Sequence, residues 1–109
     1  MNNLDKKKKL DYLKIARLFA SKWGYDANNI NFSNDGKHKL QIITPENKIV
    51  RFGHIDYDDY ILYFLNNDNT ARQHRNLYLT RTKNMLGQWK DDDYSKNNLS
   101  RRILWNADS

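Results

Sequence analysis

The sequence predicts an α+β fold, in which an N-terminal helix lies over a small three-stranded antiparallel meander and a helical C-terminal half follows. Apolar residues recur at helical spacing near the N-terminus, two turn signals then separate three β-rich runs, and helical spacing returns afterwards. A chain of 109 residues is expected to form one domain over 1–109. Within it we expect a basic helix in 1–24, the meander in 30–53 and a helical part in 55–106.

The N-terminal helix is predicted by steps of three and four residues between its apolar positions. Asn3 could cap its start, Asp5 is favourable in the first turn, and Gly24 is a natural stop. The expected buried stripe contains Leu13, Ala16, Phe19, Ala20 and Trp23.

The meander is predicted by turn chemistry. Asp35-Gly36 is a strong hairpin signal, and Pro45 marks a second turn. The three runs are Ile30–Ser33, His38–Thr44 and Lys48–Phe52. One face should be apolar, with Leu40 and Ile42 meeting either Ile49 or Val50, and it needs the helix as a second layer.

Three helices are expected in the second half. The spacing of Tyr57, Tyr60, Ile61 and Phe64 predicts a short one. Asp68 or Thr70 could cap the next helix, which should end near Gly87. Its expected inner stripe is Ala71, His74, Tyr78, Arg81 and Met85. After a loop whose acids could face a basic neighbour, a final helix is expected from about Ser95 to Trp105.

The apolar phrase near the end of the sequence has two interpretations. Leu99 and Ile103 stand one helical turn apart, and Leu104 and Trp105 widen that face. Burying these side chains would stabilise the domain by several kcal/mol, at about 1.5–3 kcal/mol each. We therefore expect this segment to close the core, while a hook for a partner remains the alternative, because Arg and Trp are typical interface anchors.

The net charge of +6 favours polyanionic partners: nucleic acid, anionic lipid or an acidic protein. Solubility alone is the plain alternative. Because no single helix displays an obvious base-reading set, we expect sequence-independent backbone contacts, with duplex DNA as the expected nucleic acid and docking on an acidic protein as the alternative. The candidate nucleic-acid-binding residues are Lys6, Lys7, Lys8, Lys9, Lys14, Arg17, Lys22, Arg72 and Lys83.

Catalytic and metal signatures are missing from the sequence. The chain has no cysteine, its histidines lack ligand spacing, and its glycines stand singly, so no enzyme activity, cofactor or metal is expected. An enzyme of unrecognised type would need a pocket with convergent titratable groups. Asp56, Asp58 and Asp59 could hold a cation, but neighbouring carboxylates on one short element point different ways.

Structural ion pairs explain these acids better. We expect Asp59 or Asp68 to pair with Arg75 or Arg81, or to cap the following helix. No apolar run approaches the roughly 20 residues of a membrane span and no signal peptide is visible. Because the chain also lacks cysteine, an intracellular, reducing location is expected: cytoplasm, nucleus or viral factory.

The stretch from Val50 to Tyr60 resembles a phenylalanine-glycine, then tyrosine-x-aspartate-tyrosine pattern of small basic proteins from giant DNA viruses and some large phages. The match spans about residues 37–106 and leaves the N-terminal helix outside it. The matching positions are Phe52, Gly53, Tyr57, Asp59, Tyr60, Asp68, Arg75, Tyr78, Arg81, Leu99, Ser100, Arg101, Leu104 and Trp105.

The chain departs from the family pattern at one position, and the resemblance implies an origin but no activity. Where the family has a histidine after the last arginine of its helix, this chain has Thr82. A role that needs that imidazole is therefore not expected here. The resemblance implies a viral origin and a virion or genome-associated protein, and it supplies no activity.

Overall fold

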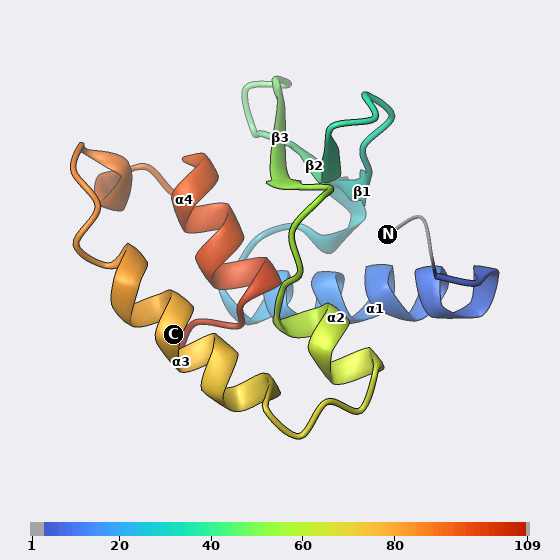
Figure 1. Cartoon of the computed structure of the whole chain (residues 1–109). Coiled ribbons are helices and arrows are strands. Elements are labelled where there is room, and N and C mark those ends of the chain that lie inside the picture. Colours follow the sequence, from blue (N-terminus) through green and yellow to red (C-terminus); the bar gives the residue numbers. More distant parts are fainter. Residues whose placement is uncertain (1–3, 109) are drawn as a thin grey trace.

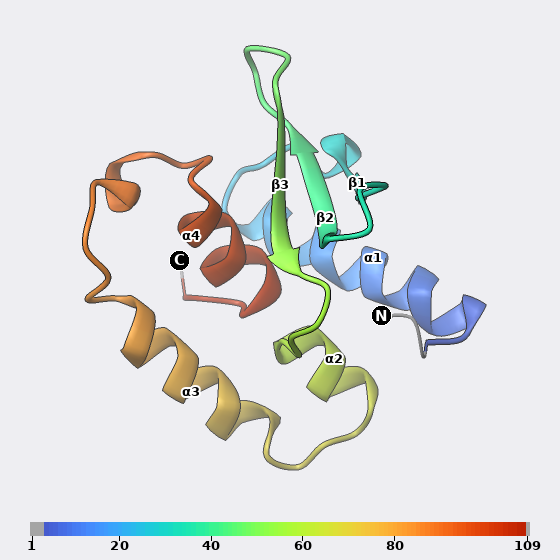
Figure 2. The same cartoon turned by 45° about the horizontal axis from the view of Figure 1, so that its top comes forward.

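The computed structural model describes residues 4–108 and confirms the α+β architecture (Figure 1). The strands form one antiparallel sheet in the order β1-β2-β3. In both cartoon views α1 runs beneath the sheet, and α3 lies along the edge of the molecule, where it packs on α2 (Figures 1 and 2). The elements are α1 (Lys6–Lys22), β1 (Ile30–Phe32), β2 (His38–Ile43), β3 (Ile49–His54), α2 (Tyr60–Leu65), α3 (Ala71–Thr82) and α4 (Lys96–Leu99), the last continued by a π-helical turn, Ser100–Leu104.

Helix α1 begins after Asp5, whose side chain accepts a 2.8 Å hydrogen bond from the backbone N–H of Lys8. Asp5 is thus the cap rather than a first-turn acid, and the expected cap Asn3 lies outside the described residues. The helix ends before Gly24, which adopts a φ of +88°. Its fully buried side chains are Tyr12, Ala16 and Ala20, while Leu13, Phe19 and Trp23 are only partly buried.

The sheet confirms both predicted turns. Asp35 accepts hydrogen bonds from the backbone N–H groups of Lys37 and His38 and so closes the first turn. On the apolar face, Leu40 pairs with Phe52 and Ile42 pairs with Val50. Val50 rather than Ile49 therefore lies on the apolar face, and Ile49 is exposed.

The short helix α2 begins three residues later than the spacing of Tyr57 suggested. Asp59 caps it by accepting a 2.9 Å bond from the backbone N–H of Leu62. Ile61 and Leu62 are buried, whereas Tyr57, which precedes the helix, and Phe64, on its outer side, are exposed.

The C-terminal segment closes the core, as predicted. Leu99, Ile103 and Leu104 are almost completely buried, and Trp105 is 8% exposed. Gly53 makes this packing possible, because a Cβ atom at that position would lie 2.6 Å from Leu104 Cδ1. None of the helices within residues 4–108 has the length and apolar character needed to cross a bilayer.

Candidate nucleic-acid interface

Helix α3 is fixed to the domain along its inner side. The Tyr78 ring stacks on Trp105, with centroids 4.2 Å apart and planes 7° from parallel. One turn earlier, the Arg75 guanidinium donates to the backbone carbonyl of Asn106 at 2.7 Å. Burial raises the pKa of the Tyr78 hydroxyl, which therefore stays protonated near neutral pH. These contacts fix which side of α3 faces outward.

The C-terminal end of α3 is held by Arg101. Its guanidinium donates to the carbonyl of Leu79 at 2.8 Å and to Thr82 Oγ1. Thr82 also donates to the carbonyl of Tyr78, so it is buried and fully engaged. A cation that binds the last carbonyls of a helix is favoured by the helix dipole. Arg101 therefore has a structural role.

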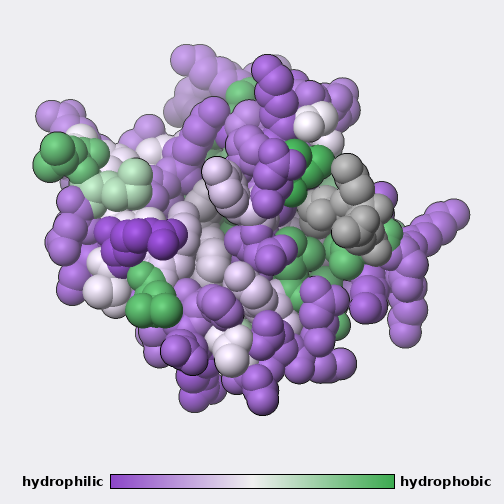
Figure 3. Space-filling model, in the orientation of Figure 1, coloured by the Kyte–Doolittle hydropathy of each residue, from purple (hydrophilic) through white to green (hydrophobic). Residues whose placement is uncertain are grey.

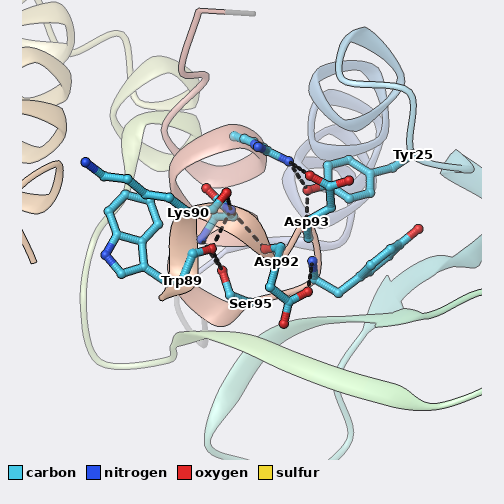
Figure 4. Close-up of polar contacts among 9 residues, drawn as sticks. Tyr25, Trp89, Lys90, Asp92, Asp93 and Ser95 are labelled. Atoms are coloured by element: carbon cyan, nitrogen blue, oxygen red, sulfur yellow. Dashed lines mark hydrogen bonds and ion pairs between the residues drawn. The ribbon is translucent and has the colours of Figure 1, made fainter. Parts of the chain in front are cut away.

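The loop after α3 is fastened by a second polar cluster (Figure 4). The Asn98 amide donates to the carbonyls of Trp89 and Asp92, at 2.7 and 2.9 Å. Arg102 forms an ion pair with Asp93 at 2.9 Å. The expectation that acids of this loop face a basic neighbour is confirmed by that pair, and α3 is joined to the C-terminal helix by an ordered connection.

The opposite side of α3 faces solvent and carries cations without any acid. From Ala71 to Lys90 the sequence contains no aspartate or glutamate. The surface over α3 is mostly hydrophilic, with an isolated hydrophobic group (Figure 3). We call the exposed set the outer face of α3; it consists of Arg72, Gln73, Asn76, Leu77, Thr80, Arg81 and Lys83.

The first turns of α1 form a second cationic surface, the lysine surface of α1. Among residues 4–108 no ion pair within 4.0 Å engages these side chains, although Asp5 caps α1 and Asp11 lies on it. The lysine at position 8 is half-buried and the others are exposed. The members are Lys6, Lys7, Lys8, Lys9 and Lys14.

Two of the cations expected to bind nucleic acid have partners within the protein. Arg17 donates to the carbonyl of Ile30 at 2.8 Å and to the Asn31 side chain at 2.9 Å, which ties α1 to β1. Lys22 donates to Asn106 Oδ1 at 2.6 Å. Arg17 therefore has a structural role that its sequence position did not indicate, because the spacing places it on α1 but does not show that β1 passes beside it. Lys22 is exposed yet also structural.

The expected ion pair of Asp59 exists, with a different partner. Its carboxylate lies 2.9 Å from the Lys39 ammonium, and both side chains are at most 2% exposed. Tyr12 Oη donates to the same carboxylate at 2.6 Å. Burial, followed by the charge of Asp59, raises the pKa of Tyr12 well above its ordinary value. Because capping α2 turns Asp59 inward toward β2, it meets Lys39 rather than Arg75 or Arg81.

The other expected ion-pair residues separate into three cases. Arg75 pairs with Asp108 at 3.1 Å. Asp68 accepts from the backbone and hydroxyl of Thr70 and closes the turn before α3, and these bonds lower its pKa. Arg81 is exposed and lies over the Tyr78 ring, 5.5 Å from its centroid. The expected structural role of Arg81 is not supported by an ion pair among the described residues.

A pocket of about 700 Å³ lies beside α3, on the side of Arg81. Its wall includes Asp56 and Asp58, both exposed, which would repel a phosphate. Two of the rings in its wall are stacked on each other: Tyr63 lies against His74, with centroids 4.2 Å apart and planes 7° from parallel. The outer face of α3 therefore suits an anion better than this pocket does.

The described residues form no metal-binding group: within residues 4–108, no three His, Asp or Glu side chains lie together. The sequence matches no protein-family model, and no similar protein was found among curated proteins or solved structures. The surface itself must carry the functional argument.

Sequence reasoning missed the neutral polar part of the outer face of α3. Gln73, Asn76 and Thr80 were passed over because no charge marks them. Their angular positions around the helix were the available signal, since residues separated by three, four and seven positions share one face.

Proposed function

We propose that this protein binds nucleic acid through contacts between exposed cations and phosphates, without a catalytic role. The observation that carries the proposal is the presence of two exposed cationic helix surfaces that the protein's own carboxylates do not neutralise: the lysine surface of α1 and the outer face of α3. Genome packaging or a place in the virion core, which the resemblance to the viral proteins implies, belongs to the same proposal.

The structure changes the set of residues in the proposal. Arg17 leaves it and Lys22 contributes less, because both bond within the protein. Arg81 joins it, since its guanidinium is exposed on the outer face of α3. Because each surface carries several exposed cations, each can contact more than one phosphate.

The test is a titration of the protein with random duplex and single-stranded DNA at two salt concentrations. Phosphate contacts release counterions. For duplex DNA, the logarithm of the binding constant should therefore fall by about 0.9 per phosphate contact for each tenfold rise in salt concentration. The double variant Lys7→Gln/Lys14→Gln should bind more weakly and show a shallower salt slope.

A matched control has the same net charge. Lys37→Gln/Lys48→Gln removes two exposed lysines from the turns of the meander, and it should leave affinity and slope nearly unchanged. Equal losses in both double variants would mean that only net charge matters, and no binding of either DNA form would refute the proposed function.

One observation favours the alternative, an adaptor that docks an acidic protein. Leu86 is 97% exposed and Met85 is 52% exposed at the end of α3, beside the cations of its outer face. Apolar groups next to charges are typical of protein interfaces. A pull-down with and without nuclease separates the two functions, because an acidic protein partner survives digestion and a nucleic-acid bridge does not.

A further inference from the structure

We propose that α3 enters the major groove of B-form duplex DNA and turns its outer face toward the base edges. This inference rests on the proposed function and deepens it. The exposed cations supply affinity for any polyanion. The uncharged side chains on the outer face of α3 would add contacts that are available only in the major groove.

The dimensions of α3 fit the groove. Its 12 residues make a rod roughly 18 Å long, at about 1.5 Å per residue. A helix with its side chains is about 10–12 Å across, and the major groove is about 12 Å wide and 8.5 Å deep. Both cartoon views place α3 at the edge of the molecule, where one side of the helix can approach a duplex (Figures 1 and 2).

Charged and neutral side chains are arranged differently around the outer face. At about 100° per residue, Arg72 and Arg81 are separated by roughly half a turn and lie on opposite edges. Lys83 lies near the edge of Arg72. Between these edges are Asn76, Thr80 and Gln73. A helix lying in a groove has phosphates on both sides and base edges beneath it, so cations at the edges and hydrogen-bonding groups in the centre are complementary to it.

The central side chains carry the chemistry that base edges recognise. Asn and Gln can bond adenine bidentately, accepting from N6 and donating to N7. Thr donates and accepts, and an apolar side chain such as Leu77 can contact the thymine methyl group. Asn76 Oδ1 accepts a 3.3 Å bond from Arg75, which leaves both amide N–H groups as donors.

Charge and groove shape together favour duplex DNA as the occupant of this face. The outer face has three cations and no carboxylate, which complements phosphate. The deep, narrow major groove of an A-form RNA duplex does not admit side chains, so RNA of the same sequence should bind by phosphate contacts alone.

The first experiment changes only the DNA. Replacing purines by 7-deazapurines removes the N7 acceptors from the major groove and keeps Watson–Crick pairing. Replacing guanine by inosine removes the exocyclic amino group from the minor groove instead. We expect the deazapurine duplex to bind at least about fivefold more weakly, as expected for losing one good base contact, and the inosine duplex to bind normally.

The second experiment changes only the protein. The triple variant Gln73→Ala/Asn76→Ala/Thr80→Ala should lose the preference for natural DNA over deazapurine DNA and over duplex RNA. Alanine is the best helix former, so the variant should keep its helix content, which circular dichroism checks. Asn28→Ala/Asn34→Ala is the matched control, since both residues are exposed and belong to the turns that flank β1.

The outcomes separate this inference from the proposed function. If natural, deazapurine and RNA duplexes bind equally and the salt slope still depends on the lysine surface of α1, the phosphate-binding function stands and the major-groove assignment is overturned. The assignment is also overturned if the triple variant keeps the groove preference. If no nucleic acid binds, both proposals fail.

Discussion

The ammonium of Lys39 and the carboxylate of Asp59 lie 2.9 Å apart with both side chains almost excluded from solvent. Residues distant in the sequence meet here: Lys39 comes from β2, Asp59 caps α2, and Tyr12 of α1 donates to the same carboxylate. One buried charge pair thus joins three elements of the core.

Removing one partner of this pair should be costly. Asp59→Asn leaves the Lys39 ammonium buried without a counter-charge and weakens the cap of α2, and we expect a loss of about 3–5 kcal/mol in the free energy of unfolding. Urea denaturation measures it. Asp56→Asn is the control, because Asp56 is exposed; equal stability of the two variants would contradict the assignment.

Gly53 should be far less replaceable than Gly36. Both have a similar positive φ, +77° and +72°, so alanine is strained at each. Only at Gly53 does the added Cβ meet Leu104 Cδ1, at 2.6 Å. We expect Gly36→Ala to cost about 1–2 kcal/mol and Gly53→Ala more, as measured by thermal unfolding. Equal costs would mean that Leu104 moves aside freely.

Substitutions of Arg17 and Lys7 should have opposite effects, the first on stability and the second on DNA affinity. Arg17→Gln breaks the contact of α1 with the carbonyl of Ile30, so we expect a stability loss of about 1–3 kcal/mol. Its affinity for DNA should change little. Lys7→Gln should weaken DNA binding and leave the unfolding midpoint unchanged. Binding and urea titrations on both variants check the pattern, and a binding defect in folded Arg17→Gln would return Arg17 to the interface.

Acid should weaken the first turn of the meander through Asp35. Its hydrogen bond with the His38 imidazole, at 2.6 Å, holds the pKa of Asp35 well below its ordinary value, with bonds from backbone N–H groups adding to the effect. Because the folded-state pKa is the lower one, the stabilisation is present above the unfolded pKa of about 4 and is lost as pH falls.

The measurement for Asp35 is the urea midpoint as a function of pH. Asp35→Asn should be less stable than the natural protein near neutral pH, and its midpoint should fall less steeply below about pH 4. Asp26→Asn supplies a comparison at another exposed turn. Parallel pH profiles for Asp35→Asn and the natural protein would contradict this role.

Asp58 should oppose DNA binding, because it is exposed in the pocket that Arg81 also lines. Asp58→Asn should therefore raise affinity, by about two- to fivefold if the repulsion resembles other exposed charge pairs. Fluorescence anisotropy at low salt measures it, and the gain should shrink at high salt. A loss of affinity would place Asp58 in a favourable contact instead.

The fold was largely predictable because its signals are local. Asp35-Gly36 and Pro45 mark the two turns, and the apolar phrase around Leu104 indicates burial wherever it packs. Helix starts were less predictable. The apolar spacing suggested that α2 starts at Tyr57, whereas it starts at Tyr60, after its cap Asp59.

Charge assignment was not predictable in the same way. Lys39 is buried although it points to the opposite face of β2 from its apolar neighbour Leu40, and no local pattern shows that. Likewise, Arg17 and Arg81 both lie on basic helices, but only the tertiary structure brings Ile30 beside one of them. Partners far apart in the sequence decide which cations are available to a ligand.

The bonds that join Lys22 and Trp23 to residues 106 and 107 connect the first helix to a segment that is synthesised much later. The N-terminal helix emerges from the ribosome first, yet the surface it buries in the finished domain is incomplete until the Leu99–Trp105 segment has also emerged. Nascent chains that lack this segment should therefore expose the part of α1 that packs against it to proteases and chaperones.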